Sequence, residues 1–289
     1  MSTAPSTHGE RPSLVFRLAA TIVMLLAAAY FLLPVYWMVV ASTKSSADLF
    51  STPGLAFGDL NFLHNLADLS SYDGGIYWRW VGNTILYSVV GSMLTVAVCA
   101  ACGYALAVFR FRGRALVLGA VLGSMLIPNT VLAQPIYLLV VQLGLNNTYW
   151  GVLLPSMVFP FGVLLCTIYA QSSIPSELLE AARLDGAGEW RIFFSIGLRL
   201  MSTGVVTVLL FAFLGSWNSY MLPLLVLTDQ KLMPLTVGLT GWNSAAITIP
   251  GLQILVVVGS LISVIPVMVV FVALQRFWRS GLTTGAVRA

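Results

Sequence analysis

The sequence predicts an all-α polytopic membrane protein with six transmembrane helices. Its 289 residues are 58% hydrophobic and only 8% charged, and the mean hydropathy is +0.93. A soluble domain carries about 25% charged residues, so a soluble fold would have no surface for this much apolar material. The chain also contains six apolar runs that reach the length of about 20 residues needed to cross a bilayer.

The six runs follow one another along the chain. They cover residues 18–42, 81–108, 115–134, 149–170, 201–227 and 251–274. Residues 136–143 either extend the third run past Pro135 or form a helix at the membrane interface. The turn-forming residues of 144–148 then separate the third run from the fourth. Several prolines are expected to kink or end helices, namely Pro128, Pro135, Pro155, Pro160, Pro223 and Pro266.

The N-terminal region is predicted to be an uncleaved anchor. Residues 27–29 are three alanines that resemble a signal-peptide cleavage site, but the apolar run continues unbroken to Val40, which is longer than a signal sequence requires. Residues 1–13 are polar and are predicted to be a disordered cytoplasmic tail. Residues 14–289 are predicted to be one transmembrane domain.

The basic residues give the orientation. With a cytoplasmic N-terminus, three basic residues fall outside: Lys44, Arg79 and Lys231. The other eleven fall inside: Arg11, Arg17, Arg110, Arg112, Arg114, Arg183, Arg191, Arg199, Arg276, Arg279 and Arg288. Because basic residues concentrate on the cytoplasmic side, both termini are predicted to be cytoplasmic and loops 43–80 and 228–250 periplasmic.

Composition and motifs exclude several functions. The net charge of +4 comes from residues at the ends of apolar runs, so it indicates membrane orientation and not nucleic-acid binding. Cys99 and Cys102 form a Cys-x-x-Cys inside an apolar run, where packing is favoured over metal or redox chemistry. A P-loop and the common hydrolase and metalloprotease motifs are missing from the sequence, which predicts no catalytic residue, no metal site and no bound ATP.

The predicted spans contain no Asp, Glu, Lys, Arg or His. Proton relays and ion-coupled carriers place such residues inside the membrane. The sequence therefore disfavours an ion-coupled carrier and a membrane-embedded enzyme, and it favours a neutral or weakly charged solute.

The cytoplasmic loop 171–200 carries the clearest local pattern. Pro175 and Ser176 are helix-start signals, and good helix formers continue to Leu184. Gly186 and Gly188 are expected to end this helix, and a second amphipathic segment follows from residue 189. On these residues alone, the first helix either docks into a groove on another protein or lies on the lipid surface.

This loop resembles the EAA motif of binding-protein-dependent ABC importers. The residues in register are Glu180, Ala181, Ala182, Gly186, Ile196 and Leu198, whereas Arg199 stands where the motif ends in proline. Two further elements resemble the maltose/glycerol-phosphate class of sugar permeases. One is Ser216-Trp217-Asn218, and the other is the tail 275–287, which contains the sequences Gln-Arg and Gly-Leu-Thr. The resemblance extends over the whole chain.

The resemblance implies a type I ABC importer permease fold in a bacterial inner membrane. The EAA loop would be a coupling helix docked on a separate ATPase, with Glu180 making a polar contact, Ala181 and Ala182 packing, and Asp185-Gly186 turning the chain. Two ATPase subunits would bind ATP and Mg²⁺. A second homologous permease and an extracytoplasmic solute-binding protein would complete the complex. The solute would be a sugar; glycerol-3-phosphate, an amino sugar or another polar molecule is the alternative.

Six polar or aromatic residues in or beside the runs are candidates for lining the solute pathway, because amides and aromatic faces suit sugars. They are Asn83, Asn129, Gln134, Trp217, Asn218 and Tyr220. The alternative for each is interhelical packing, since polar residues also join helices within membranes. A further hypothesis is that loop 228–250, with Trp242, reaches into the solute-binding protein.

Overall fold

A computed structural model of the protein describes residues 14–285, and the predicted tail 1–13 lies outside them. All regular elements in that range are helical. The α-helices are α1 (Leu14–Ser42), α2 (Asp48–Ser51), α3 (Phe62–Ser71), α4 (Ile76–Val108), α5 (Arg114–Ser124), α6 (Asn129–Gln142), α7 (Tyr149–Ser156), α8 (Pro160–Ser173), α9 (Ser176–Leu184), α10 (Glu189–Ile192), α11 (Leu198–Leu200), α12 (Ser202–Trp217), α13 (Met221–Val226), α14 (Leu235–Ala245) and α15 (Leu252–Gly285).

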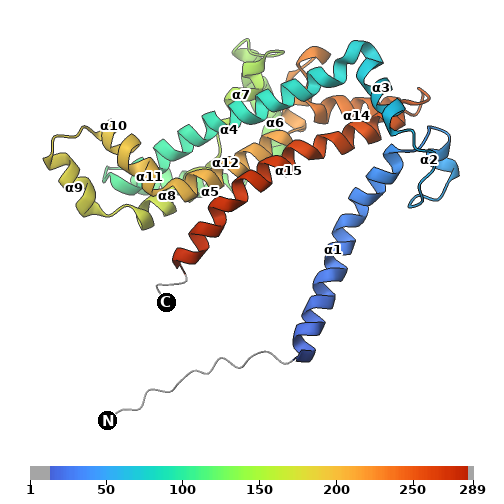
Figure 1. Ribbon diagram of the computed structural model, residues 1–289. Coiled ribbons are helices and arrows are strands. Elements are labelled where there is room, and N and C mark those ends of the chain that lie inside the picture. The colour runs from blue at the N-terminus through green and yellow to red at the C-terminus, as the bar shows by residue number, and fades with distance from the viewer. Residues whose placement is uncertain (1–13, 286–289) are drawn as a thin grey trace.

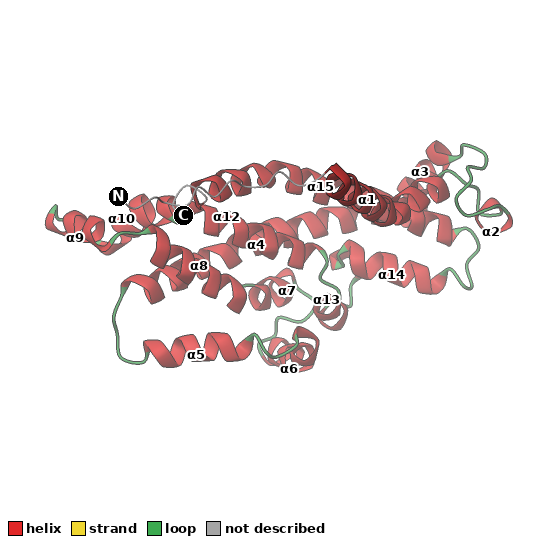
Figure 2. Cartoon of the chain, turned by 90° about the horizontal axis from the view of Figure 1, so that it is seen from below, coloured by secondary structure: helices red, strands yellow, loops and turns green. Residues whose placement is uncertain are grey.

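The helices form an elongated bundle around α4. Helix α4 packs against α8 and α12, and α15 packs against α12 and α14. Figure 2 shows α9 and α10 at one end of this bundle, together with the connection from α4 to α5, and α2 and α3 at the opposite end. Helix α1 leaves the bundle and contacts α15 only near its own C-terminal end (Figure 1).

Three of the six predicted spans are continuous helices in the structure. These are α1, α4 and the part of α15 from Leu252 to Ala273, and each is long and apolar enough to cross a membrane. The third and fourth predicted spans are bent pairs of helices, and the fifth follows a bend at its first residue. The bends are 109° between α5 and α6, 42° between α7 and α8, and 80° between the segment Glu189–Leu200 and α12. The count of six therefore holds when each bent pair is one span.

The breaks in the third and fourth spans fall at two of the prolines that were expected from the sequence to kink or end helices. Pro128 precedes the first residue of α6 with an extended backbone, and Pro160 is the first residue of α8. A proline lacks the N–H that would continue the preceding helix, so both breaks have a local cause. Prolines 34, 135, 155 and 266 instead lie inside helices.

The fifth span ends earlier than predicted. Helix α12 stops at Trp217, ten residues before the predicted boundary at 227, and the short helix α13 begins only at Met221. Tyr220 between them has φ −127° and ψ −54°, outside the α-helical range. The intervening residues thus turn the chain at the edge of the bundle.

Helix α4 satisfies the irregular backbone that these breaks create. Thr95 Oγ1 donates to the carbonyl of Ser156 at 2.9 Å, and Cys99 Sγ donates to that of Phe159 at 3.5 Å, both at the break between α7 and α8. Within a membrane, freed backbone groups need partners from the protein. Cys99 is therefore a packing residue, as the sequence predicted.

Candidate functional site

The cytoplasmic loop predicted from the sequence folds as two helices joined by a glycine turn. Helix α9 begins directly after Pro175, whose backbone is extended, and it ends at Leu184. Gly186 has φ +78°, a conformation that costs a residue with a Cβ about 1–2 kcal/mol. Its N–H donates to the carbonyl of Arg183, and the N–H of Ala187 donates to that of Ala182, both at 3.0 Å. These two bonds form a Schellman cap, which fixes where α9 stops.

An ion pair closes the turn. Arg183 Nε donates to Glu189 Oε1 at 2.7 Å, and Arg183 Nη2 donates to Glu189 Oε2 at 3.3 Å. The hydrogen bond to Glu189 raises the pKa of the Arg183 guanidinium above its usual value. The two-pronged geometry holds the end of α9 to the start of α10, so the loop has a defined shape although both side chains are partly exposed.

The predicted motif residues lie on the outside of this loop. Glu180, Ala181, Asp185 and Gly186 are exposed and Ala182 is half-buried, whereas Leu179 is buried. Leu184 and Trp190 add apolar side chains that are 89% and 74% exposed. A small-residue helix with exposed apolar neighbours can approach another protein closely.

Sequence reasoning did not single out two aromatic residues of this surface. Trp190 and Phe194 stack with ring centroids 6.2 Å apart, and both are exposed. Their spacing of four residues in an amphipathic segment was the available signal. Phe193, between them in sequence, points the other way and packs on Tyr104 of α4 with a centroid distance of 5.1 Å.

The loop joins the membrane part through a bend. Residues 193–197 form a π-helical turn, and Gly197 is needed there because a Cβ would lie 2.9 Å from the Tyr104 ring. Arg199 replaces the motif proline, yet the chain bends by 80° immediately afterwards, at the fully buried Met201. The bend does not depend on proline at this position.

Two of the predicted pathway residues are engaged in packing. The Asn83 amide donates to the carbonyls of Lys231 and Met233 at 2.9 and 3.0 Å, and its Oδ1 accepts a bond from Tyr149 at 3.0 Å. Trp217 is buried and stacks on Phe213. These contacts favour the packing alternative for both residues, and their role in the pathway stays a prediction.

The other four candidates are exposed. Asn129 and Gln134 lie on α6, beyond the 109° bend, and Asn218 donates its amide N–H to the Leu214 carbonyl of its own helix. Tyr220 is 37% exposed and borders a cavity of about 420 Å³ between α13, the segment 227–234 and α14.

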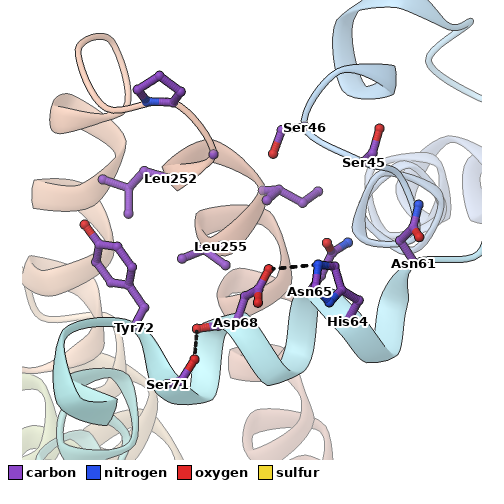
Figure 3. A pocket seen from close by; sticks show the side chains of 13 residues that line it. Ser45, Ser46, Asn61, His64, Asn65, Asp68, Ser71, Tyr72, Leu252 and Leu255 are labelled. Carbon is purple, nitrogen blue, oxygen red and sulfur yellow. Dashed lines mark hydrogen bonds and ion pairs between the residues drawn. The ribbon is translucent and has the colours of Figure 1, made fainter.

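A second cavity of about 500 Å³ lies at the end of the bundle opposite α9. It is formed by α3, the segment after α1 and the start of α15, and its lining combines polar side chains with the apolar Leu252 and Leu255 (Figure 3). His64 Nε2 lies 3.5 Å from Asp68 Oδ2 within it. Asn65 donates from Nδ2 to the carbonyls of Ser42 and Lys44, both at 2.9 Å, and so ties α3 to the end of α1.

The same arrangement of helices occurs in a transporter of known structure. A crystal structure of a bacterial ABC transporter involved in the import of the acidic polysaccharide alginate contains a chain with the same fold. The TM-score is 0.79 at 23% sequence identity, and the match covers 95% of this chain and 99% of that one.

The family follows from the sequence match. Residues 97–280 match the family described as the inner membrane component of binding-protein-dependent transport systems, and the chain belongs to this family. It is 31% identical over 282 residues to the arabinooligosaccharides transport system permease protein AraQ of Bacillus subtilis (strain 168), covering 95% of this chain and 96% of AraQ.

Other similar relatives are named for different solutes. The lactose transport system permease protein LacG of Rhizobium radiobacter is 29% identical over 90% of this chain and 92% of its own length. The sn-glycerol-3-phosphate transport system permease protein UgpE of Salmonella typhi is 28% identical over 90% and 93%. The protein is thus a multi-pass permease of the carbohydrate-uptake type.

Proposed function

We propose that this permease carries a neutral sugar or oligosaccharide across a bacterial inner membrane, driven by ATP hydrolysis in a separate subunit. The observation that carries the proposal is the α9–Gly186–α10 loop, a rigid, exposed projection at one end of the bundle. Two observations support a neutral solute. Similar relatives are named for arabinooligosaccharides and lactose, and the predicted spans contain no Asp, Glu, Lys, Arg or His. The glycerol-3-phosphate relative keeps an anionic solute as the second candidate.

In this proposal, the loop docks on an ATPase. Glu180 contacts a polar group there, and Ala181 and Ala182 let the two surfaces approach. Leu184 and Trp190 supply apolar contact area that is otherwise in water. Two ATPases that close on ATP and Mg²⁺ would then move both permeases between inward- and outward-facing states.

The same proposal gives the orientation. Arg110 and Arg112 lie in the α4–α5 connection and Arg114 begins α5, at the α9 end of the bundle (Figure 2). Under the positive-inside rule, that end is then the cytoplasmic one. Both termini are then cytoplasmic. The α3 end, with the second cavity, faces the periplasm and the solute-binding protein (Figure 3).

Helix α1 supports a second permease as a partner. Its most apolar window has a mean hydropathy of 2.3 and none of its residues buried by the rest of the chain. A helix that is apolar all round needs lipid or another protein on every side. We assign one of its faces to the second permease and the others to lipid.

The test is to purify the tagged chain from its native host in mild detergent and to identify the co-purifying proteins by mass spectrometry. We expect an ATPase and a second permease. A Glu180→Lys, Gly186→Pro variant should lose the ATPase and retain the permease, because proline cannot adopt φ +78°.

The matched control is Glu177→Lys, which makes the same charge change in the first turn of α9, outside the motif. Retention of the ATPase by the double variant, or its equal loss in the control, would contradict the docking surface. Recovery of the unmodified chain with no ATPase at all would contradict the importer function itself.

A further inference from the structure

The cavity beside Tyr220 has the chemistry of a carbohydrate subsite. Its exposed lining includes the Tyr220 phenol, the Gln230 amide and the hydroxyls of Thr240 and Ser244. None of the residues around it is charged at neutral pH. Sugars are bound by aromatic faces and by neutral hydrogen-bonding groups, whereas anions require basic residues or helix ends.

The two hydroxyls are oriented by their own helix. Thr240 Oγ1 donates to the carbonyl of Thr236 at 2.7 Å, and Ser244 Oγ donates to that of Thr240 at 3.1 Å. Both oxygens therefore keep lone pairs that can accept hydrogen bonds from a solute hydroxyl. They lie one helical turn apart on α14, which suits successive hydroxyls of one sugar.

The walls of the cavity are held by side chains of α4. Trp80 Nε1 donates to the carbonyl of Gln230 at 2.8 Å, and Tyr87 donates to that of Leu232 at 3.0 Å. Thr84 Oγ1 accepts a bond from the N–H of Leu235 at 2.7 Å. With the two bonds from Asn83, every carbonyl from 230 to 233 is bound by α4. A site fixed in advance loses less entropy when a ligand binds.

Two glycines of α14 differ in their surroundings. A Cβ on Gly238 would lie 2.3 Å from the Trp80 ring, so packing against α4 requires glycine there. A Cβ on Gly241 would meet nothing within 4 Å, and Gly241 borders the cavity. A larger side chain at position 241 would therefore extend into the cavity.

From these observations we propose that the cavity is a subsite for a neutral sugar, contributed by this subunit at the outer end of the solute pathway. Tyr220 packs against one face of the sugar ring, Gln230, Thr240 and Ser244 hydrogen-bond its hydroxyls, and Gly241 leaves room for it. The inference rests on the proposed function and adds to it where this subunit contacts the solute.

The first experiment uses the assembled transporter in vesicles, with its solute-binding protein and ATP. The probes are arabinotriose, lactose and raffinose, with glycerol 3-phosphate as an anionic comparator. Gly241→Phe should fill the cavity and lower uptake of a transported sugar by about tenfold or more, the effect of losing one or two good contacts. Binding-protein-stimulated ATP hydrolysis should persist, because the coupling loop is untouched.

Gly119→Phe is the matched control: it is the same substitution at a helical glycine whose Cβ would also meet nothing within 4 Å, and Gly119 does not line the cavity, so uptake should be unchanged. Normal sugar uptake by Gly241→Phe would overturn the subsite and leave the importer function standing. Failure of the unmodified transporter to import any of the neutral sugars would overturn both.

A second measurement detects binding without transport. Thr240→Cys, in a Cys102→Ala background that removes the exposed native cysteine, is labelled by a water-soluble thiol reagent. The transported sugar at millimolar concentration should slow this labelling severalfold, and glycerol 3-phosphate should not. Labelling that the sugar leaves unchanged, or a cysteine that the assembled transporter covers completely, would overturn the subsite.

Discussion

Helices α1 and α4 are both long and strongly apolar, yet they occupy opposite environments. Their most apolar windows have mean hydropathies of 2.3 and 2.1. The α1 window has 0% of its residues buried, whereas 39% of the α4 window is buried inside the bundle (Figure 1). Hydropathy alone therefore identifies a membrane helix without saying whether lipid or protein surrounds it.

The pattern of small and polar residues explains the difference. One face of α4 carries such residues at every fourth position: Asn83, Tyr87, Gly91, Thr95, Cys99 and Gly103. At one end of this row, Asn83 donates to the carbonyl of Met233. In the middle, Thr95 donates to the carbonyl of Ser156 at the break between α7 and α8. At the other end, Gly103 has no side chain and α8 packs directly against it. Helix α1 has no comparable row, and Thr21 bonds only to the carbonyl of Arg17 in its own helix. Small and polar residues on one face mark a helix that packs against protein.

The largest loss of stability is expected from adding a side chain where α4 and α8 approach each other most closely. Gly103→Leu would place a Cβ 2.4 Å from the Cys166 Cβ and 2.8 Å from backbone atoms of Cys166 and Thr167. Overpacking commonly costs about 1–3 kcal/mol, and backbone atoms cannot move aside as a flexible side chain does. We expect little or no folded protein in fluorescence-detected size exclusion. Ala28→Leu on α1 is the control and should behave like the unmodified chain; equal behaviour of the two variants would break the comparison.

A smaller loss of stability is expected from removing the hydrogen bonds of the Asn83 side chain. Asn83→Leu leaves the Met233 carbonyl and the Tyr149 hydroxyl without a partner, at about 1–3 kcal/mol for an unsatisfied buried group, whereas the Lys231 carbonyl keeps its bond from Arg79 Nε. The midpoint of thermal unfolding in detergent should fall clearly. Asn129→Leu, at an exposed position, should change it far less. Tyr149→Phe in combination with Asn83→Leu should lower the midpoint by less than the sum of the two single effects, because the pair shares one bond.

A still smaller loss of stability is expected from removing the Thr95 hydrogen bond at the break between α7 and α8. Thr95→Val removes the bond to Ser156 and keeps the side-chain shape, and such bonds within membranes contribute about 0.6 kcal/mol. Thr21→Val on α1 removes only a bond within one helix. The difference in unfolding midpoint between these two isosteric changes measures the tertiary bond directly. A difference of zero would mean that the Ser156 carbonyl finds another partner.

The smallest effect on the isolated chain is expected on α1. Ala28→Trp adds a large side chain where the chain itself has no neighbour, so its unfolding midpoint should not change. In the assembled complex, the same variant should reduce the amount of co-purifying second permease if residue 28 lies on the face that touches it. A series of tryptophan substitutions from residue 22 to 33 should show this loss with a helical period. Equal recovery at every position would indicate that lipid alone surrounds α1.

Much of the fold follows from local sequence patterns. Apolar run lengths predicted the six spans, and Pro175, Ser176 and Gly186 predicted the limits of α9, since a helix start and a glycine cap depend on a few neighbouring residues. The EAA residues predicted where an exposed loop would project. The same kind of local rule predicted the breaks at Pro128 and Pro160, whereas the sizes of the bends depend on how the flanking helices pack.

The sequence by itself determined that the chain crosses a membrane, where its helices begin and which loop projects from the bundle. Only the tertiary structure decided which helix is central and which carbonyls it binds. Trp80 and Gln230 are 150 residues apart, as are Asn83 and Met233, and no local pattern pairs them. The physical reason is the sequence distance over which each interaction acts: helix formation and capping depend on residues within one or two turns of each other. The burial of α4, its hydrogen bonds to the carbonyls of residues 230–233 and the cavity beside Tyr220 arise only when distant segments pack together.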